Sequence, residues 1–281
     1  MNARAVAALT AAVDVIVPAG PDAWRFTADV AGAPLTGDAV SDGDWLDLTV
    51  PAGESRAVLD DWRSLERNAT LPAGVRLVAT TAGIGLRADV PLAADGDATS
   101  LLRAAVGALA AAAGLAGAPA RSDAAAAPAT NAAPERITAP RFATAPRGAD
   151  EWTVDLAVPD LAARAVVRRA PDATLAVTVA LLDEMPQALS ATARRAVARL
   201  LGRVATLVRL ARPAVDVGAP ASLRFEVLGV DADAVALDHA CGALAAACRL
   251  AAAETPALLS DDALARRFLA LDTAVTIARA A

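Results

Sequence analysis

The sequence contains no lysine and no tyrosine, one histidine and two cysteines, and aromatic residues make up only 3% of its 281 positions. Without lysine, a phosphate-binding loop of the G-x-x-x-x-G-K-[ST] type is excluded. The single histidine, His239, excludes mechanisms that need two histidines and limits schemes based on a serine or cysteine nucleophile. We therefore expect no catalytic residues and no enzyme activity. An enzyme would need clustered polar residues in a closed pocket, which the sequence does not offer.

The two cysteines, Cys241 and Cys248, lie seven residues apart on a predicted helix. Helical rise places them about 10.5 Å apart, which exceeds the reach of a disulfide. We interpret them as small buried apolar residues in a reducing compartment, so we expect a cytoplasmic protein. A metal site that joins them to His239 is the alternative, but residues two apart on a helix point in different directions and no fourth ligand is evident. We predict no metal site and no cofactor.

All 26 basic residues are arginine, and 32 acidic residues give a net charge of -6. This acidic balance argues against nucleic-acid binding, which depends on a basic surface. The mean hydropathy is +0.43, yet no run approaches the roughly 20 strongly apolar residues of a membrane span. We therefore expect no nucleic-acid or membrane partner. At the N-terminus, Asp14 and the weak alanine-rich stretch before it count against a signal peptide, and we expect residues 3–17 to form the first helix.

What the sequence does contain is an internal repeat. The heptad Pro18-Ala19-Gly20-Pro21-Asp22-Ala23-Trp24 returns as Pro146-Arg147-Gly148-Ala149-Asp150-Glu151-Trp152, with Pro, Gly, Asp and Trp at identical spacings. Residues 101–115 and 236–250 share a second frame, in which Leu102, Gly107, Leu109 and Leu115 correspond to Leu237, Gly242, Leu244 and Leu250. A domain has been duplicated. We expect a first repeat at 1–115, an Ala/Pro-rich linker at 116–145 and a second repeat with an added C-terminal helix at 146–281.

The apolar periodicity predicts the same order of elements in both halves. In the first half, after the leading helix, we expect strands at 24–30, within 34–44 and at 46–50, a helix at 54–68, a hairpin of strands at 75–79 and 86–90 that turns at Gly83 and Gly85, and a helix at 99–113. In the second half we expect strands at 152–158, 163–169 and 175–181, a helix at 190–211, strands at 215–217 and 223–227, and helices at 234–254 and 258–277.

Each half therefore reads (α)βββαββα, an α+β unit whose antiparallel sheet carries helices on one face. The leading helix of the second copy would fall in the linker, where Pro134 and Pro140 break it. The stretches 65–68, 71–78 (Leu-Pro-Ala-Gly-Val-Arg-Leu-Val) and 85–92 (Gly-Leu-Arg-Ala-Asp-Val-Pro-Leu) resemble the YbjN family and the type III secretion chaperones of the CesT kind. The resemblance covers both halves apart from the linker and tail, and rests on topology and element lengths; the second half departs from it by its missing first helix.

That resemblance implies a small, catalytically silent domain that dimerises and holds an extended segment of a client protein on sheet and groove surfaces. Two copies in one chain then imply an intramolecular pseudo-dimer or a homodimer. The resulting hypothesis is a non-enzymatic, chaperone-like adaptor that binds a peptide or protein. The alternative is a regulatory or structural scaffold that assembles with a folded partner or with itself.

Two features are candidate partner-binding sites. Between Ser190 and Pro213 the sequence has arginines and no acidic residue, whereas the corresponding helix of the first repeat carries Glu54, Asp60, Asp61 and Glu66; the arginines are Arg194, Arg195, Arg199, Arg203, Arg209 and Arg212. These patterns indicate solvated polar faces, or two helices that face each other, or a row at Arg195, Arg199 and Arg203 that receives an acidic client.

The second candidate is Trp45. It has the opposite parity to the apolar residues that follow it in its predicted strand, so it projects to the wetter face, where a bound segment could contact it. Trp24 and Trp152 have the parity of core residues, and we expect both to be buried.

Overall fold

The computed structural model describes residues 2–53, 62–81, 83–92, 98–115, 139–148, 150–158, 162–170, 174–186, 188–216 and 222–280, the last nine of these as backbone only. It is an α+β protein with two similar units in tandem, as the duplication predicts, and each unit has a six-stranded antiparallel sheet where five strands were expected. The chain divides into two compact units. Unit 1 comprises residues 1–55 and 71–131, and unit 2 comprises residues 56–70 and 132–281.

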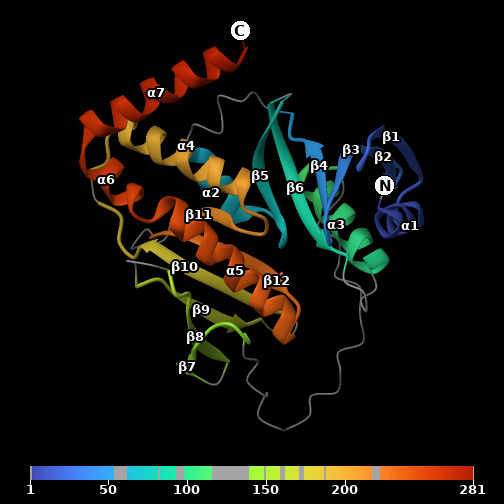
Figure 1. The fold of residues 1–281 in the computed structure, drawn as a ribbon, viewed down its shortest axis with the longest axis horizontal. Coiled ribbons are helices and arrows are strands. Elements are labelled where there is room, and N and C mark those ends of the chain that lie inside the picture. Colours follow the sequence, from blue (N-terminus) through green and yellow to red (C-terminus); the bar gives the residue numbers. More distant parts are fainter. Residues whose placement is uncertain are drawn as a thin grey trace. The chain divides into compact units, whose positions relative to one another are not determined.

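Unit 1 is one sheet with two helices on the same face (Figure 1). Helix α3 packs along the strands, chiefly β6, and α1 packs against α3 and β1. The strand order is β1-β2-β3-β4-β6-β5. The elements are α1 (Ala3–Ala12), β1 (Val15–Gly20), β2 (Ala23–Val30), β3 (Ala33–Asp42), β4 (Trp45–Pro51), β5 (Val75–Thr80), β6 (Gly83–Pro91) and α3 (Ala98–Ala112).

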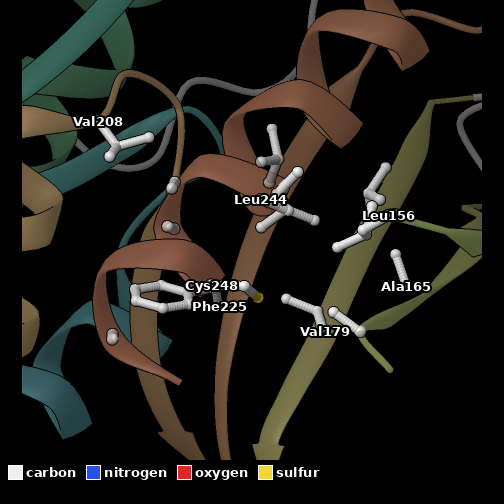
Figure 2. Packing of buried hydrophobic residues seen from close by; sticks show 14 of the residues in the cluster. Leu156, Ala165, Val179, Val208, Phe225, Leu244 and Cys248 are labelled. Atoms are coloured by element: carbon white, nitrogen blue, oxygen red, sulfur yellow. The ribbon is translucent and has the colours of Figure 1, made fainter. Parts of the chain in front are cut away.

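Unit 2 repeats the sheet with the order β11-β12-β10-β9-β8-β7. Helix α5 lies on β10 and β12, and in Figure 2 its Leu244 and Cys248 point toward β10, which carries Val179. The elements are β7 (Thr144–Pro146), β8 (Glu151–Asp155), β9 (Arg164–Arg169), β10 (Leu175–Leu182), α4 (Ala191–Leu207), β11 (Arg212–Asp216), β12 (Ser222–Val230), α5 (Ala234–Ala251), α6 (Glu254–Ser260) and α7 (Asp262–Ala280).

The repeated heptad forms the same hairpin in both units. Pro18 on β1 is in register with Trp24 on β2, and Pro146 on β7 is in register with Trp152 on β8. Both tryptophans are buried, as their parity predicts. The second repeated frame falls on α3 and α5 and places two of its three leucine pairs in the core, Leu102 with Leu237 and Leu109 with Leu244. The third pair, Leu115 just past α3 and Leu250 on α5, is exposed.

The hairpin adds one strand to each sheet that periodicity did not reveal. The expected first helix at 3–17 ends at Ala12, and the residues after Asp14 form β1. A strand at a sheet edge that is exposed over most of its length lacks the alternation of a half-buried strand, which is why the pattern was missed. The middle strand is also longer than expected, because β3 extends unbroken from Ala33 to Asp42. Only glycine fits at position 37 in the middle of β3, because a Cβ there would lie 2.8 Å from the Phe26 ring.

Other expected boundaries change less. Gly83 and Gly85, which were expected to form a turn, belong to β6. The expected C-terminal helix is two helices, α6 and α7. Residues 139–145 of the expected linker include the buried Ala139 and the first two residues of β7. The rest of that linker, the part of the 54–68 helix before Trp62, and Val217 lie outside the described residues.

The helix α2 (Trp62–Thr70) departs most from the duplicated plan. By sequence it belongs to the first repeat, between β4 and β5, yet it packs against β11 and α4 and belongs to unit 2. Its Leu65 is 1% exposed and lies in the apolar core of unit 2, with Trp62 packed against the same core. Because α4 is its counterpart in the second repeat, the two equivalent helices lie against each other, which was one of the arrangements expected for them.

Candidate protein-interaction surfaces

The sheet of unit 1 has one face under α1 and α3 and a second face made largely of polar side chains. Register places one row of this second face across all six strands, so its members are neighbours on one surface. The row is Val17, Arg25, Asp38, Thr49, Arg87 and Arg76. Its two ends differ in exposure: the β5 end is buried and the β1 end is open.

At the buried end, a carboxylate is held between two arginines. The Asp89 side chain is fully buried and Arg76 is 2% exposed; Arg76 Nη1 pairs with Asp89 Oδ2. Arg87 Nε donates to Asp89 Oδ1 at 2.7 Å, and its Nη2 lies 2.5 Å from Asp47 Oδ2. Two cations therefore meet two anions, so the cluster is neutral. Hydrogen bonds between two ionised groups are shorter and stronger than those between neutral groups.

Unit 2 contains a similar cluster. Arg224 and Glu226 on β12 correspond to Arg87 and Asp89 on β6, but Arg212 on β11 stands directly opposite Glu226, whereas Arg76 on β5 stands opposite Arg87. Arg212 Nε donates to Glu226 Oε1 at 2.8 Å, and Arg224 Nε donates to Glu226 Oε2 at 2.9 Å. Burial lowers the pKa of Arg212, and the carboxylate of Glu226 opposes that shift. Thr178 stands opposite Glu226, where Asp47 stands opposite Asp89 in unit 1. The sequence contains a pattern that could have indicated this cluster, an arginine two residues before an acidic residue at the same place in both repeats. The alternation of polar and apolar residues in the strand does not show that these polar side chains are buried.

At the open end, apolar side chains surround a surface ion pair. Val15 and Val17 on β1 are 52% and 53% exposed, and Val40 on β3 is also exposed. Between the strands, Arg25 Nε lies 3.5 Å from Asp38 Oδ1, with both side chains largely in solvent. A surface pair of this kind contributes little to stability. The open end thus combines apolar contact area with a charge pair that can be rearranged.

The outer edge of β1 adjoins this open face. In the part of the chain that the structure describes, β1 pairs with β2 alone, so its outward backbone groups face no strand. Proteins usually protect such edges with proline, bulges or charge. Here Pro18 and a register shift between Pro18 and Gly20 blunt the second half of the strand. Residues 15–17 remain an apolar, unprotected edge.

The structure places Trp45 where its parity predicts. Leu46 and Leu48 are fully buried, whereas Trp45 is half-buried at the start of β4. It is in register with Asp42 and Pro91, on the polar face of the sheet. A role for Trp45 in partner binding stays a prediction.

The arginine row lies on α4 in unit 2. Arg195, Arg199 and Arg203 follow one another at i, i+4 spacing, so they share a helix face. Arg195 and Arg203 are exposed. Arg199 is half-buried, and its Nη1 donates to the carbonyl of Leu269 on α7 at 3.3 Å. One member of the row is therefore engaged by α7, and Trp45 belongs to the other unit.

The residues considered for metal binding do not converge. His239 is exposed on α5, while Cys241 and Cys248 are buried and free. Within the described ranges, no group of three or more histidine, cysteine, aspartate or glutamate residues could hold a metal ion. Burial raises the pKa of the Cys241 thiol to about 12, with a further contribution from Asp238, and burial raises that of Cys248 to about 11. Both thiols are core side chains, as expected.

Helix α5 is long and apolar enough to cross a membrane by length and composition, the one such helix among the described residues. In unit 2 it is a core helix, because one apolar face of the helix packs on β10 and β12. No protein-family model, curated protein or solved structure matches the chain.

Proposed function

We propose that the chain is a non-enzymatic, chaperone-like adaptor that binds an extended segment of a client protein along the outer edge of β1. The observation that carries this proposal is the edge itself, three residues of apolar strand with exposed Val15 and Val17 and no strand beside them in the described chain. An extended peptide can pair with such an edge through main-chain hydrogen bonds, while side-chain contacts on the sheet face give specificity.

The neighbouring surfaces favour a particular kind of segment. Added beside β1, it would continue the open face, with apolar side chains beside Val15 and Val17. Its other face would turn toward α1, which packs against β1 on the covered side. We therefore expect a segment of alternating apolar residues, unfolded before it binds.

The test starts with affinity capture on the full chain and continues with hydrogen–deuterium exchange on the captured complex. We expect slower exchange of the β1 amides and a short protease-protected segment in the client. The double variant Val15→Lys/Val17→Lys should abolish capture, because lysines on an edge strand oppose pairing. Val235→Lys, which changes an exposed valine on α5, is the matched control.

Capture that is undiminished in the double variant would contradict the proposal. A folded partner that protects no short segment would instead favour the alternative, a scaffold that assembles with folded proteins.

A further inference from the structure

The segment that carries α2 leaves one unit and completes the other. Both strands that flank it, β4 and β5, pair with β6 in the sheet of unit 1. The helix between them contacts β11 and α4 and belongs to unit 2 (Figure 1). The first repeat of the sequence thus supplies a helix to the core of unit 2, and the chain on both sides of this helix leads to strands of unit 1.

This site, which we call the α2 seat, consists of the surfaces of β11 and α4 that contact α2. Leu65 enters the core of unit 2 at the seat, and Trp62 packs at its border. Without α2, core residues of unit 2 would be exposed to water, which is unfavourable in proportion to their apolar area. An occupied seat is therefore strongly preferred over an empty one.

The seat is also selective. Besides Leu65, α2 buries two polar side chains, Ser64 and Asn68, each 2% exposed. Buried polar groups need matching hydrogen-bond partners, so an arbitrary apolar helix would leave some of them unsatisfied. The α2 helix itself meets these requirements, and every further copy of the chain contains an identical α2 helix.

We propose that α2 is exchangeable and that the α2 seat of one copy accepts α2 from a second copy of this chain. The non-covalent contacts of α2 are the same whether it binds the seat of its own chain or that of a second copy. The equilibrium between monomer and exchanged dimer is therefore set by the chain connection on either side of α2 and by the protein concentration. The closed monomer dominates in dilute solution, and a dimer with exchanged α2 helices forms as concentration rises. The partner copy then contributes Leu65 to the core of unit 2.

Native mass spectrometry of the full chain tests this exchange. Unlabelled and ¹⁵N-labelled protein are mixed in equal amounts, and the mixed dimer is followed over time at concentrations from about 1 µM to about 1 mM. We expect a dimer whose fraction grows with concentration. Because release of α2 from the seat precedes exchange, Leu65→Ala should speed the appearance of mixed dimers by at least about tenfold.

Two variants serve as controls. Leu207→Ala truncates a leucine that is 75% exposed at the end of α4 and should leave the mixing rate unchanged. Leu65→Met conserves volume and should mix at close to the wild-type rate even if Leu65→Ala reduces the folded fraction seen by circular dichroism. A chain that is monomeric at every concentration, or a dimer whose mixing rate is the same for Leu65→Ala and wild type, would overturn the proposal.

Discussion

Arg212 and Glu226 form an ion pair in which Nη2 lies 2.7 Å from Oε1 and the two side chains are 4% and 3% exposed. Arg76 and Asp89 form a similar buried pair in unit 1, although Arg76 lies opposite Arg87 in register and not opposite Asp89. In each unit a second arginine, two residues before the carboxylate, binds its other oxygen. The duplication has therefore preserved a buried polar cluster as well as the apolar core.

The first prediction concerns this cluster. Glu226→Gln and Asp89→Asn should each lower the free energy of unfolding by about 3–5 kcal/mol, because each leaves a buried guanidinium without its counter-charge. Asp38→Asn removes a carboxylate from an exposed pair and should change it by less than about 1 kcal/mol. Urea unfolding of the three variants measures the difference. Equal losses of stability in all three variants would show that the contribution of the cluster to stability does not depend on its burial.

The second prediction concerns the assignment of α2 to unit 2. Leu65→Ala should cost about 2–5 kcal/mol, since it removes a buried leucine side chain from a packed core. Hydrogen–deuterium exchange should rise in β11, against which α2 packs, and remain unchanged in β2 of unit 1. Leu207→Ala is the control on an exposed leucine. Faster exchange confined to unit 1 would mean that α2 stabilises its own repeat instead.

The third prediction uses the absence of lysine and tyrosine, which leaves the two thiols as the main side chains that titrate between pH 9 and 11. Their pKa values rise from 9.0 to about 12 for Cys241 and about 11 for Cys248. Below pH 9 the thiols are protonated in both the folded and the unfolded protein, so they add no pH dependence to the free energy of unfolding. Above pH 9 only the unfolded state loses them, and stability should fall by up to about 1.4 kcal/mol per pH unit per thiol.

Urea unfolding at pH 8 and pH 10 measures this slope. The variant Cys241→Val/Cys248→Ala carries the residues found at the corresponding positions of the first repeat, Val106 and Ala113. It should lose most of the alkaline dependence. An unchanged slope in the variant would assign the dependence to other groups. At pH 8, both thiols of the folded wild type should also resist alkylation and react only after unfolding.

The fourth prediction separates the members of the arginine row. Arg199→Glu should loosen α7, because it removes the donor to the Leu269 carbonyl and places an anion beside that oxygen. Limited proteolysis should then cut within α7 sooner than in wild type. Arg195→Glu changes an exposed neighbour and should leave the cleavage rate of α7 unaltered. If Arg195→Glu weakens client binding and Arg199→Glu does not, the exposed part of the row is the client contact.

Much of the fold was accessible from sequence because periodicity reports burial. Strands β9, β10 and β12 appear close to their expected positions, since each has one face in the core and one in water. Helix α4 begins as expected but ends at Leu207 instead of residue 211, so Arg209 and Arg212 are not on it, and Arg212 begins β11. The candidate sites were less accessible. Trp45 was placed on the correct face by parity, but nothing in the sequence marked Val15 and Val17 as exposed, because two valines near an apolar run are equally typical of a core.

Inspection of the sequence was enough to predict the duplication, the α+β class, the buried tryptophans of the repeated heptad and the core position of Cys241 and Cys248. Each depends on spacing or on side-chain chemistry, which are local properties. The folded chain was needed to show that β1 is a sheet edge, that Arg76 and Arg212 are buried against carboxylates, and that α2 packs in unit 2. These depend on which segments meet, and α2 has the same apolar stripe whichever core it covers.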